Sequence, residues 1–173
     1  MSPFGQKKLK RGIKFEPVAR DKYHDVMIHH LRRPVALRKT GMVIPPSMFW
    51  LEASPDGLVM DPCSCSPYGM FGGIEIKCQE GKKNHTPQEA MEDESFRIEL
   101  IDGKPSLKKD HHLGYYTQIQ LASFCGLEWD DFVVHLFKGM NIIRVTFSKA
   151  YFDKVLGKIN TFYTKWYLPQ VMS

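Results

Sequence analysis

The feature that most restricts the possible folds of this chain is a short alternating run at residues 73–78, Gly-Ile-Glu-Ile-Lys-Cys. Side chains of a β-strand point alternately to its two faces, so Ile74 and Ile76 share one face. Glu75 and Lys77 share the other face, about 7 Å apart along the strand. Such a strand belongs in a sheet that packs its apolar face against other elements, and it presents a carboxylate and an amine together on the opposite face.

Helical periodicity appears on either side of the strand-like runs. Ala19, Tyr23 and Met27 recur every four residues, as on the buried stripe of a helix. Because Pro17 fits only in a first turn, we expect this helix to start at about Phe15. A second helix is expected at 110–124, and a closing helix follows Ser148, with its apolar stripe at Phe152, Val155, Leu156, Ile159, Tyr163 and Trp166.

Several further runs have β character. They lie at 35–37, 42–44, 49–53, 58–60, 132–137 and 142–147, and a hairpin is expected within 96–107. The polar segment 79–95 is interpreted as a flexible insertion. The order of elements predicts a mixed α/β (α+β) domain, with a central mixed β-sheet flanked by helices in three layers at most. Three tryptophans lie in apolar patterns and are predicted to be in the core: Trp50, Trp129 and Trp166.

Length and composition favour one globular unit. The chain has 173 residues, of which 43% are hydrophobic and 25% charged, so it is not a disordered chain. Its apolar runs are far shorter than the ~20 residues that span a bilayer, so we expect no membrane partner and a location inside the cell, in either nucleus or cytoplasm. We predict a flexible basic arm at 1–12 and a single domain at 13–173.

Positive charge is concentrated at the start of the chain. The first 39 residues contain 11 Lys or Arg and 3 Asp or Glu, a net charge of +8, whereas the whole chain carries +5. The remainder is therefore mildly acidic. A basic segment of this kind indicates a polyanion partner such as nucleic acid, although a solvated basic helix face explains the charge equally well.

Asp56 is a candidate partner for the charged pair. It lies in the turn Ser54-Pro55-Asp56-Gly57, directly before a predicted strand. If that strand pairs with residues 73–78, the Asp56 carboxylate approaches Glu75. Two carboxylates and a backbone carbonyl form a hard oxygen site suited to Mg²⁺ or Mn²⁺, and a lysine beside it can orient a water or neutralise a phosphate. From these residues alone, an exposed Glu–Lys pair on a half-solvated strand explains the pattern as well.

The set Pro55-Asp56…Glu75-Ile76-Lys77 resembles the metal-binding core of the PD-(D/E)xK nuclease superfamily. More specifically, the chain resembles the phage lambda exonuclease and YqaJ-type viral recombinase family. The motifs that carry this resemblance are Gly12-xxx-Glu16-xx-Ala19-Arg20, Ser54-Pro55-Asp56-Gly57 and Tyr115-xx-Gln118-x-Gln120.

The resemblance implies a restriction-endonuclease-like core and a Mg²⁺-dependent deoxyribonuclease, with Mn²⁺ able to substitute. Asp56, Glu75 and the Ile76 carbonyl would hold the metal, and Lys77 would activate water or stabilise the transition state. Glu16 would act on the metal through water, and Gln118 would position the reacting groups. The DNA-binding residues would be Lys7, Lys8, Lys10, Arg11, Lys14, Arg20 and Tyr115.

The favoured activity is 5′→3′ exonuclease action on duplex DNA ends in recombination or end processing. The expected partners are DNA, a single-strand annealing protein and further copies of the chain in a homo-oligomer. An endonuclease or nickase on the same core, and a DNA-end-binding module without turnover, remain as alternatives. The family carries a longer helical region before the Glu16 helix, whereas 15 residues precede Glu16 here, which leaves the preference for 5′ ends and the oligomeric state open.

Three simpler interpretations stand beside these roles. Glu16 can form a salt bridge with Arg20 four residues later on the same helix face. Gln118 can be an ordinary buried amide. The cysteines at 63, 65 and 78 lack the paired spacing of a zinc site and are interpreted as loop thiols.

Overall fold

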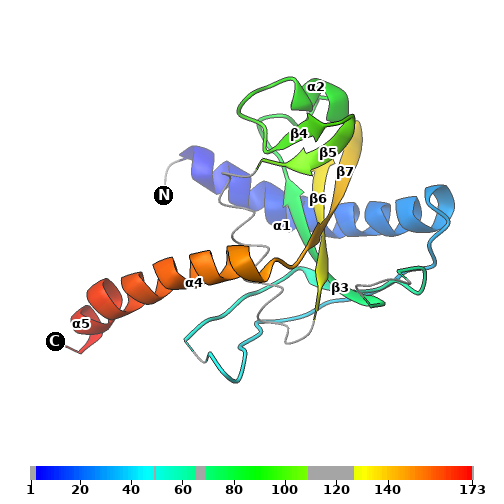
Figure 1. The fold of residues 1–173 in the computed structure, drawn as a ribbon. Coiled ribbons are helices and arrows are strands. Elements are labelled where there is room, and N and C mark those ends of the chain that lie inside the picture. Colours follow the sequence, from blue (N-terminus) through cyan, green and yellow to red (C-terminus); the bar gives the residue numbers. More distant parts are fainter. Residues whose placement is uncertain (1–2, 49, 65–68, 109–126, 173) are drawn as a thin grey trace.

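A five-stranded mixed sheet forms the centre of the protein (Figure 1). The computed structural model describes residues 3–48, 50–64, 69–108 and 127–172, with side chains from residue 10 onward. The strands are β1 (Ala36–Arg38), β2 (Gly57–Met60), β3 (Phe71–Cys78), β6 (Trp129–Leu136) and β7 (Gly139–Thr146). Their order is β1-β2-β3-β6-β7, and only β3 and β6 are parallel neighbours. The predicted fold class, a central mixed sheet flanked by helices, is confirmed.

One face of this sheet is covered by α1 (Pro3–Asp25), which continues into the π-helical turn η1 (Val26–His30). Ala19, Tyr23 and Met27 are buried against the apolar side chains of β3, as their spacing predicts. The predicted start near Phe15 is wrong, because α1 begins twelve residues earlier and takes in most of the segment assigned to a flexible arm. Lys, Arg and Gln favour helices without any apolar periodicity, so the sequence pattern missed this extension.

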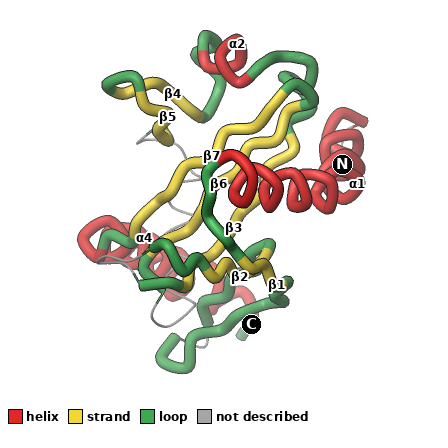
Figure 2. Tube along the Cα trace, turned by 90° about the vertical axis from the view of Figure 1, so that its right-hand side faces the viewer, coloured by secondary structure: helices red, strands yellow, loops and turns green. Residues whose placement is uncertain are grey.

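The other face of the sheet packs against a small second layer. It consists of α2 (Pro87–Met91) and the hairpin of β4 (Ile98–Ile101) and β5 (Lys104–Leu107). Figure 2 shows this layer beside one end of the larger sheet. The hairpin is confirmed, whereas the segment 79–95 is not simply an insertion, because Thr86 and Glu89 form a capping box that starts α2.

The two strands predicted at 42–44 and 49–53 do not form a regular β-ladder in the described residues. Within 42–44 and 50–53, only Val43 and Ala53 form an isolated antiparallel bridge. Pro45 and Pro46 lie between these runs and donate no hydrogen bonds, which is consistent with the lack of a longer ladder. The helix predicted at 110–124 lies outside the described residues.

The C-terminal helical segment extends away from the sheet (Figure 1). It comprises α4 (Lys149–Phe162), η2 (Tyr163–Tyr167) and α5 (Leu168–Val171). The Ser148 hydroxyl accepts a hydrogen bond from the Tyr151 N–H at 3.4 Å, which confirms the predicted cap. Of the predicted apolar stripe, only the first turns are buried, at Phe152 and Val155.

The three tryptophans have different surroundings. Trp129 is fully buried, as predicted. Trp50 is half-buried and stacks on Tyr163 at 5.7 Å between ring centroids. Trp166 is 65% exposed, so the prediction that it belongs to the core is wrong. The reason is that this end of the helix extends past the sheet. Among the described residues, no helix has the length and apolar character needed to cross a bilayer.

Candidate active site

Pairing of β2 with β3 places Asp56 beside the centre of β3. The register sets Gly57 opposite Ile74, and the Asp56 N–H donates to the Ile74 carbonyl at 3.1 Å. The Asp56 carboxylate in turn accepts a hydrogen bond from the Ile76 N–H at 2.6 Å. The backbone therefore holds this side chain next to Glu75-Ile76-Lys77, as expected from the sequence.

Glu75 and Lys77 form an ion pair on one face of β3. The Glu75 side chain is only 2% exposed, whereas that of Lys77 is 31% exposed. The alternative of an exposed Glu–Lys pair on a half-solvated strand is therefore wrong. A carboxylate is rarely buried unless it is paired, so this position requires the lysine or another cation.

The electrostatic surroundings of Asp56 are unusual for a carboxylate. Burial raises its pKa from 3.8 to about 7, and the negative charge of Glu75 acts in the same direction. Glu16 on α1 adds a smaller contribution of the same sign, while the Ile76 N–H and the Lys77 amine oppose it. The negative charges of Glu75 and Glu16 thus both act on Asp56, so positive charge beside Asp56 would be favourable.

Glu16 and Arg20 approach this point from α1. Their side chains form an ion pair at 3.0 Å, which is the simpler interpretation considered for Glu16. Arg20 nevertheless lies against the Asp56 turn, because a Cβ added to Gly57 would come within 3.1 Å of its Nη1 atom. Its Nε and Nη1 atoms are buried and have no hydrogen-bonding partner in the part of the chain that the structure describes. Arg20 therefore lies between α1 and the Asp56 turn, beside Ile74.

Asp130 is a fourth acidic residue near this site, which the sequence analysis did not identify. It lies on β6 opposite Gly73 of β3 and is 1% exposed. Neither carboxylate oxygen has a hydrogen-bonding partner among the described residues. Burial raises its pKa well above the ordinary value, and the charge of Glu75 adds to this.

This donor set fits a hard divalent cation. Asp56, Glu75 and the Ile76 carbonyl would supply oxygen ligands, and the buried carboxylate of Asp130 lacks a hydrogen-bonding partner among the described residues. Across residues 10–48, 50–64, 69–108 and 127–172, no three His, Cys, Asp or Glu side chains are already arranged around a common point. The expected metal site uses only two such side chains, Asp56 and Glu75. In this structure the Asp56 carboxylate accepts a hydrogen bond from the Ile76 N–H, and the Glu75 carboxylate is paired with the Lys77 amine.

One proposed DNA-binding residue has a different position. Arg11 is 4% exposed, donates to the Gln79 carbonyl at 3.1 Å and lies over the rings of Phe15 and Phe137. It joins α1 to the end of β3 and does not extend into solvent, so this position favours a structural role, and DNA binding by Arg11 stays a prediction. The number of basic residues in this segment does not show which of them is buried, so the sequence could not distinguish Arg11 from its basic neighbours.

The other predicted residues divide into two groups. Lys10 and Lys14 are exposed on α1, in agreement with a role at the surface. The side chains of Lys7 and Lys8 lie outside the described residues, as do Tyr115 and Gln118. The described thiols, Cys63 and Cys78, are free.

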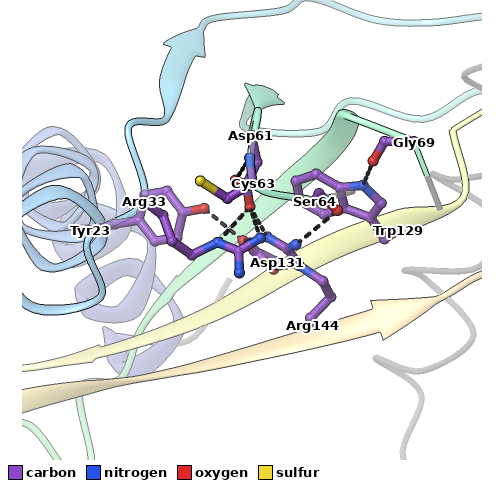
Figure 3. A network of polar contacts seen from close by, with 9 residues as sticks. All are labelled: Tyr23, Arg33, Asp61, Cys63, Ser64, Gly69, Trp129, Asp131 and Arg144. Carbon is purple, nitrogen blue, oxygen red and sulfur yellow. Dashed lines mark hydrogen bonds and ion pairs between the residues drawn. The ribbon is translucent and has the colours of Figure 1, made fainter. Parts of the chain in front are cut away.

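A polar network on the opposite face of the sheet was also missed (Figure 3). Asp131 accepts hydrogen bonds from the Tyr23 hydroxyl at 2.6 Å and from Arg144 Nε at 2.8 Å. Asp61 accepts from Arg33 and Arg144, and these hydrogen bonds lower its pKa although burial acts in the opposite direction. The network ties α1, β6 and β7 together. Its only signal in the sequence is a set of charges within apolar strands.

Comparisons with known proteins identify the family and the fold of the chain. The family model of the YqaJ-like viral recombinase domain matches residues 2–125. The fold is similar to the crystal structure of LHK-Exo in complex with dAMP, with a TM-score of 0.63, 24% identity, and coverage of 92% of this chain and 68% of that one.

A second crystal structure, of the alkaline exonuclease LHK-Exo from Laribacter hongkongensis, gives a TM-score of 0.62 at 23% identity and covers 91% of this chain and 68% of its own. No curated protein matches the chain. The family match extends over more than half of the sequence and includes Glu16, Asp56, Glu75 and Lys77. The chain therefore belongs to the family of YqaJ-like viral recombinase domains.

Proposed function

We propose that this protein is a divalent-metal-dependent deoxyribonuclease that hydrolyses phosphodiester bonds, and that it acts as a 5′→3′ exonuclease on duplex ends during recombination or end processing. The observation that carries the proposal is the hydrogen bond from the Ile76 N–H to the Asp56 carboxylate, which holds Asp56 beside the buried Glu75. Membership of the recombinase family and a fold like that of an alkaline exonuclease support it.

Mg²⁺ is the cation that suits the site best. Asp56, Glu75 and the Ile76 carbonyl would hold it, and Mn²⁺ has the same preference for oxygen ligands. When bound, the cation supplies positive charge beside the phosphodiester under attack. Binding would also satisfy the clustered carboxylates, which act unfavourably on one another in the metal-free protein.

The side chains around the metal position have separate tasks. The Lys77 amine is partly exposed, so it can contact a water or a phosphate oxygen while Glu75 orients it. Glu16 would hold a water that faces the metal. The unpartnered nitrogens of Arg20 can donate to a phosphate oxygen next to Asp56. Gln118 is proposed, from the family motif alone, to position the reacting groups.

DNA is the proposed substrate for two reasons. The exposed Lys10 and Lys14 lie on the same helix as Glu16 and Arg20, so positive charge leads toward the site. One structural neighbour was crystallised with dAMP, a deoxynucleotide. A single-strand annealing protein and further copies of the chain are proposed partners from family membership.

The test compares linear 5′-phosphorylated duplex with closed circular DNA, each in Mg²⁺ and in Ca²⁺. Lys77→Met keeps the apolar stem and removes the amine. Lys149→Met is the matched control, because Lys149 pairs with Asp153 on the exposed surface of α4. We expect Mg²⁺-dependent loss of the linear duplex only, abolished in Lys77→Met and retained in Lys149→Met.

Other outcomes select the alternatives. Cleavage of the circle would establish an endonuclease or nickase on the same core. DNA binding without cleavage, unchanged by Mg²⁺ and by Glu75→Gln, would identify a DNA-end-binding module without turnover and overturn the proposal.

A further inference from the structure

Asp130 lies next to the proposed ligands, on the same face of the sheet. Strands β3 and β6 are parallel, with Gly73 opposite Asp130 and Glu75 opposite Phe132. Gly73 and Glu75 are two residues apart, so their side-chain positions face the same way as that of Asp130. A Cβ added to Gly73 would come within 2.7 Å of Asp130 Oδ1. The missing side chain at Gly73 therefore provides the space that the Asp130 carboxylate fills.

The buried carboxylate of Asp130 has no compensation within the described part of the protein. Both oxygens lack hydrogen-bonding partners, although the residue is only 1% exposed. Its neighbour Asp131 shows how such a group is ordinarily satisfied, since it receives hydrogen bonds from Tyr23 and Arg144 on the opposite face. An ionised carboxylate buried without a partner is strongly unfavourable, so the ionised form of Asp130 needs a source of positive charge nearby.

The charges that act on Asp130 show where that source would lie. Among the charged neighbours, the negative charge of Glu75 acts on it most strongly, followed by those of Asp131 and Asp56, and the opposing positive charge is that of Lys77. The Lys77 amine is paired with Glu75. Asp131 already has Arg144 as its counter-charge on the opposite face. The Asp56–Glu75 site, on the same face as Asp130, is therefore the place where a divalent cation would bring two positive charges.

We propose that Asp130 is a further acidic residue of this metal site, a positioning residue whose negative charge stabilises the bound divalent cation from outside the set Asp56, Glu75 and Ile76 carbonyl. This inference rests on the proposed metal site and extends it. Mg²⁺ keeps several waters in protein sites, so a carboxylate near the ion contributes to its binding without being a direct ligand. The packing of Asp130 over Gly73 fixes the carboxylate at this place.

The test measures metal binding directly, without DNA and without turnover. Mn²⁺ and Mg²⁺ are titrated into the intact chain at about pH 8 by calorimetry. Asp130→Asn keeps the size of the side chain and removes its charge. We expect a loss of at least about tenfold in affinity for both ions, because the removed charge acts across a water-poor interior.

Two control variants separate this effect from general damage. Asp131→Asn removes the adjacent carboxylate on the opposite face, and Asp153→Asn removes an exposed one on α4. Both should bind Mn²⁺ within about twofold of the unchanged chain. Asp130→Ser is a second uncharged variant, whose side chain is smaller than that of aspartate and therefore fits the same space. Circular dichroism establishes which variants are folded.

The outcomes are distinguishable. Unchanged metal affinity in a folded Asp130→Asn or Asp130→Ser protein would overturn the inference and leave the proposed function standing. An equal loss in Asp131→Asn would also overturn it, since the effect would then not be specific to this face. Failure of the unchanged chain to bind either ion would remove the proposed metal site itself.

Discussion

Asp56→Asn should make the metal-free protein more stable at neutral and alkaline pH. The pKa of Asp56 is raised from 3.8 to about 7 by burial and by Glu75, so folding favours its protonated form. Between these two values the folded state binds more protons than the unfolded state, and the free energy of unfolding falls as pH rises. Above about pH 7 this loss is complete.

The size of the effect follows from the two pKa values. Their difference corresponds to an upper limit of about 4 kcal/mol at 25 °C. Asp56 is partly accessible to solvent and lies beside Lys77, and both reduce the penalty, so we expect a gain of about 2 kcal/mol in Asp56→Asn at pH 8. Asparagine can still accept the Ile76 hydrogen bond, which is why the substitution tests charge and not geometry.

Urea denaturation in EDTA, from about pH 4 to pH 8, measures this gain. The stability of the unchanged chain should decline through the window more steeply than that of Asp56→Asn, and the two should converge at the acidic end. Glu52→Gln, which removes an exposed carboxylate from the same segment, should follow the unchanged chain. Added Mg²⁺ should stabilise the unchanged chain and not Asp56→Asn. Equal or lower stability of Asp56→Asn at pH 8 in EDTA would refute the electrostatic reasoning.

Three further variants test other parts of the structure. Arg11→Ala should lower the free energy of unfolding by about 2 kcal/mol in urea denaturation, because it removes a buried side chain stacked on two aromatic rings. An unchanged free energy of unfolding would contradict this structural role of Arg11. Gly72→Ala should cost at least about 3 kcal/mol in thermal or urea unfolding, because its Cβ would come within 2.2 Å of the buried Trp129 ring. A stable Gly72→Ala protein would contradict this packing. Replacing Lys10 and Lys14 together by Gln should weaken DNA binding for all sequences alike and reduce the salt slope by about two, as measured by fluorescence anisotropy at several salt concentrations; an unchanged slope would rule out phosphate contacts at these lysines.

Asp130 and Asp131 are adjacent in the sequence but have different surroundings in the sheet. Successive side chains of β6 point to opposite faces, so two identical neighbours meet unrelated surroundings. Asp131 completes a satisfied network with Tyr23 and Arg144. Asp130 faces the proposed metal site with no such partners among the described residues.

Local sequence determined a large part of the site. Alternation in 73–78 was enough to place Glu75 and Lys77 on one face of a strand, because side-chain direction in a strand depends only on position along it. The spacing of Ala19, Tyr23 and Met27 identified the buried face of α1 for the same kind of reason. Motif order supported the approach of Asp56, which the β2–β3 register then confirmed.

Only the tertiary structure decided the rest, because those features depend on which segments meet. Burial of Glu75 requires the neighbouring strands, and the position of Asp130 depends on the parallel register of β6 against β3. Arg11 is indistinguishable from surrounding basic residues until α1 packs beside Phe137. Trp166 lies on the apolar stripe of a helix, which predicts that it is buried. The helix extends past the sheet, however, so the Trp166 side chain is exposed. Periodicity in a sequence shows which face of an element is apolar, whereas long-range pairing determines what that face meets.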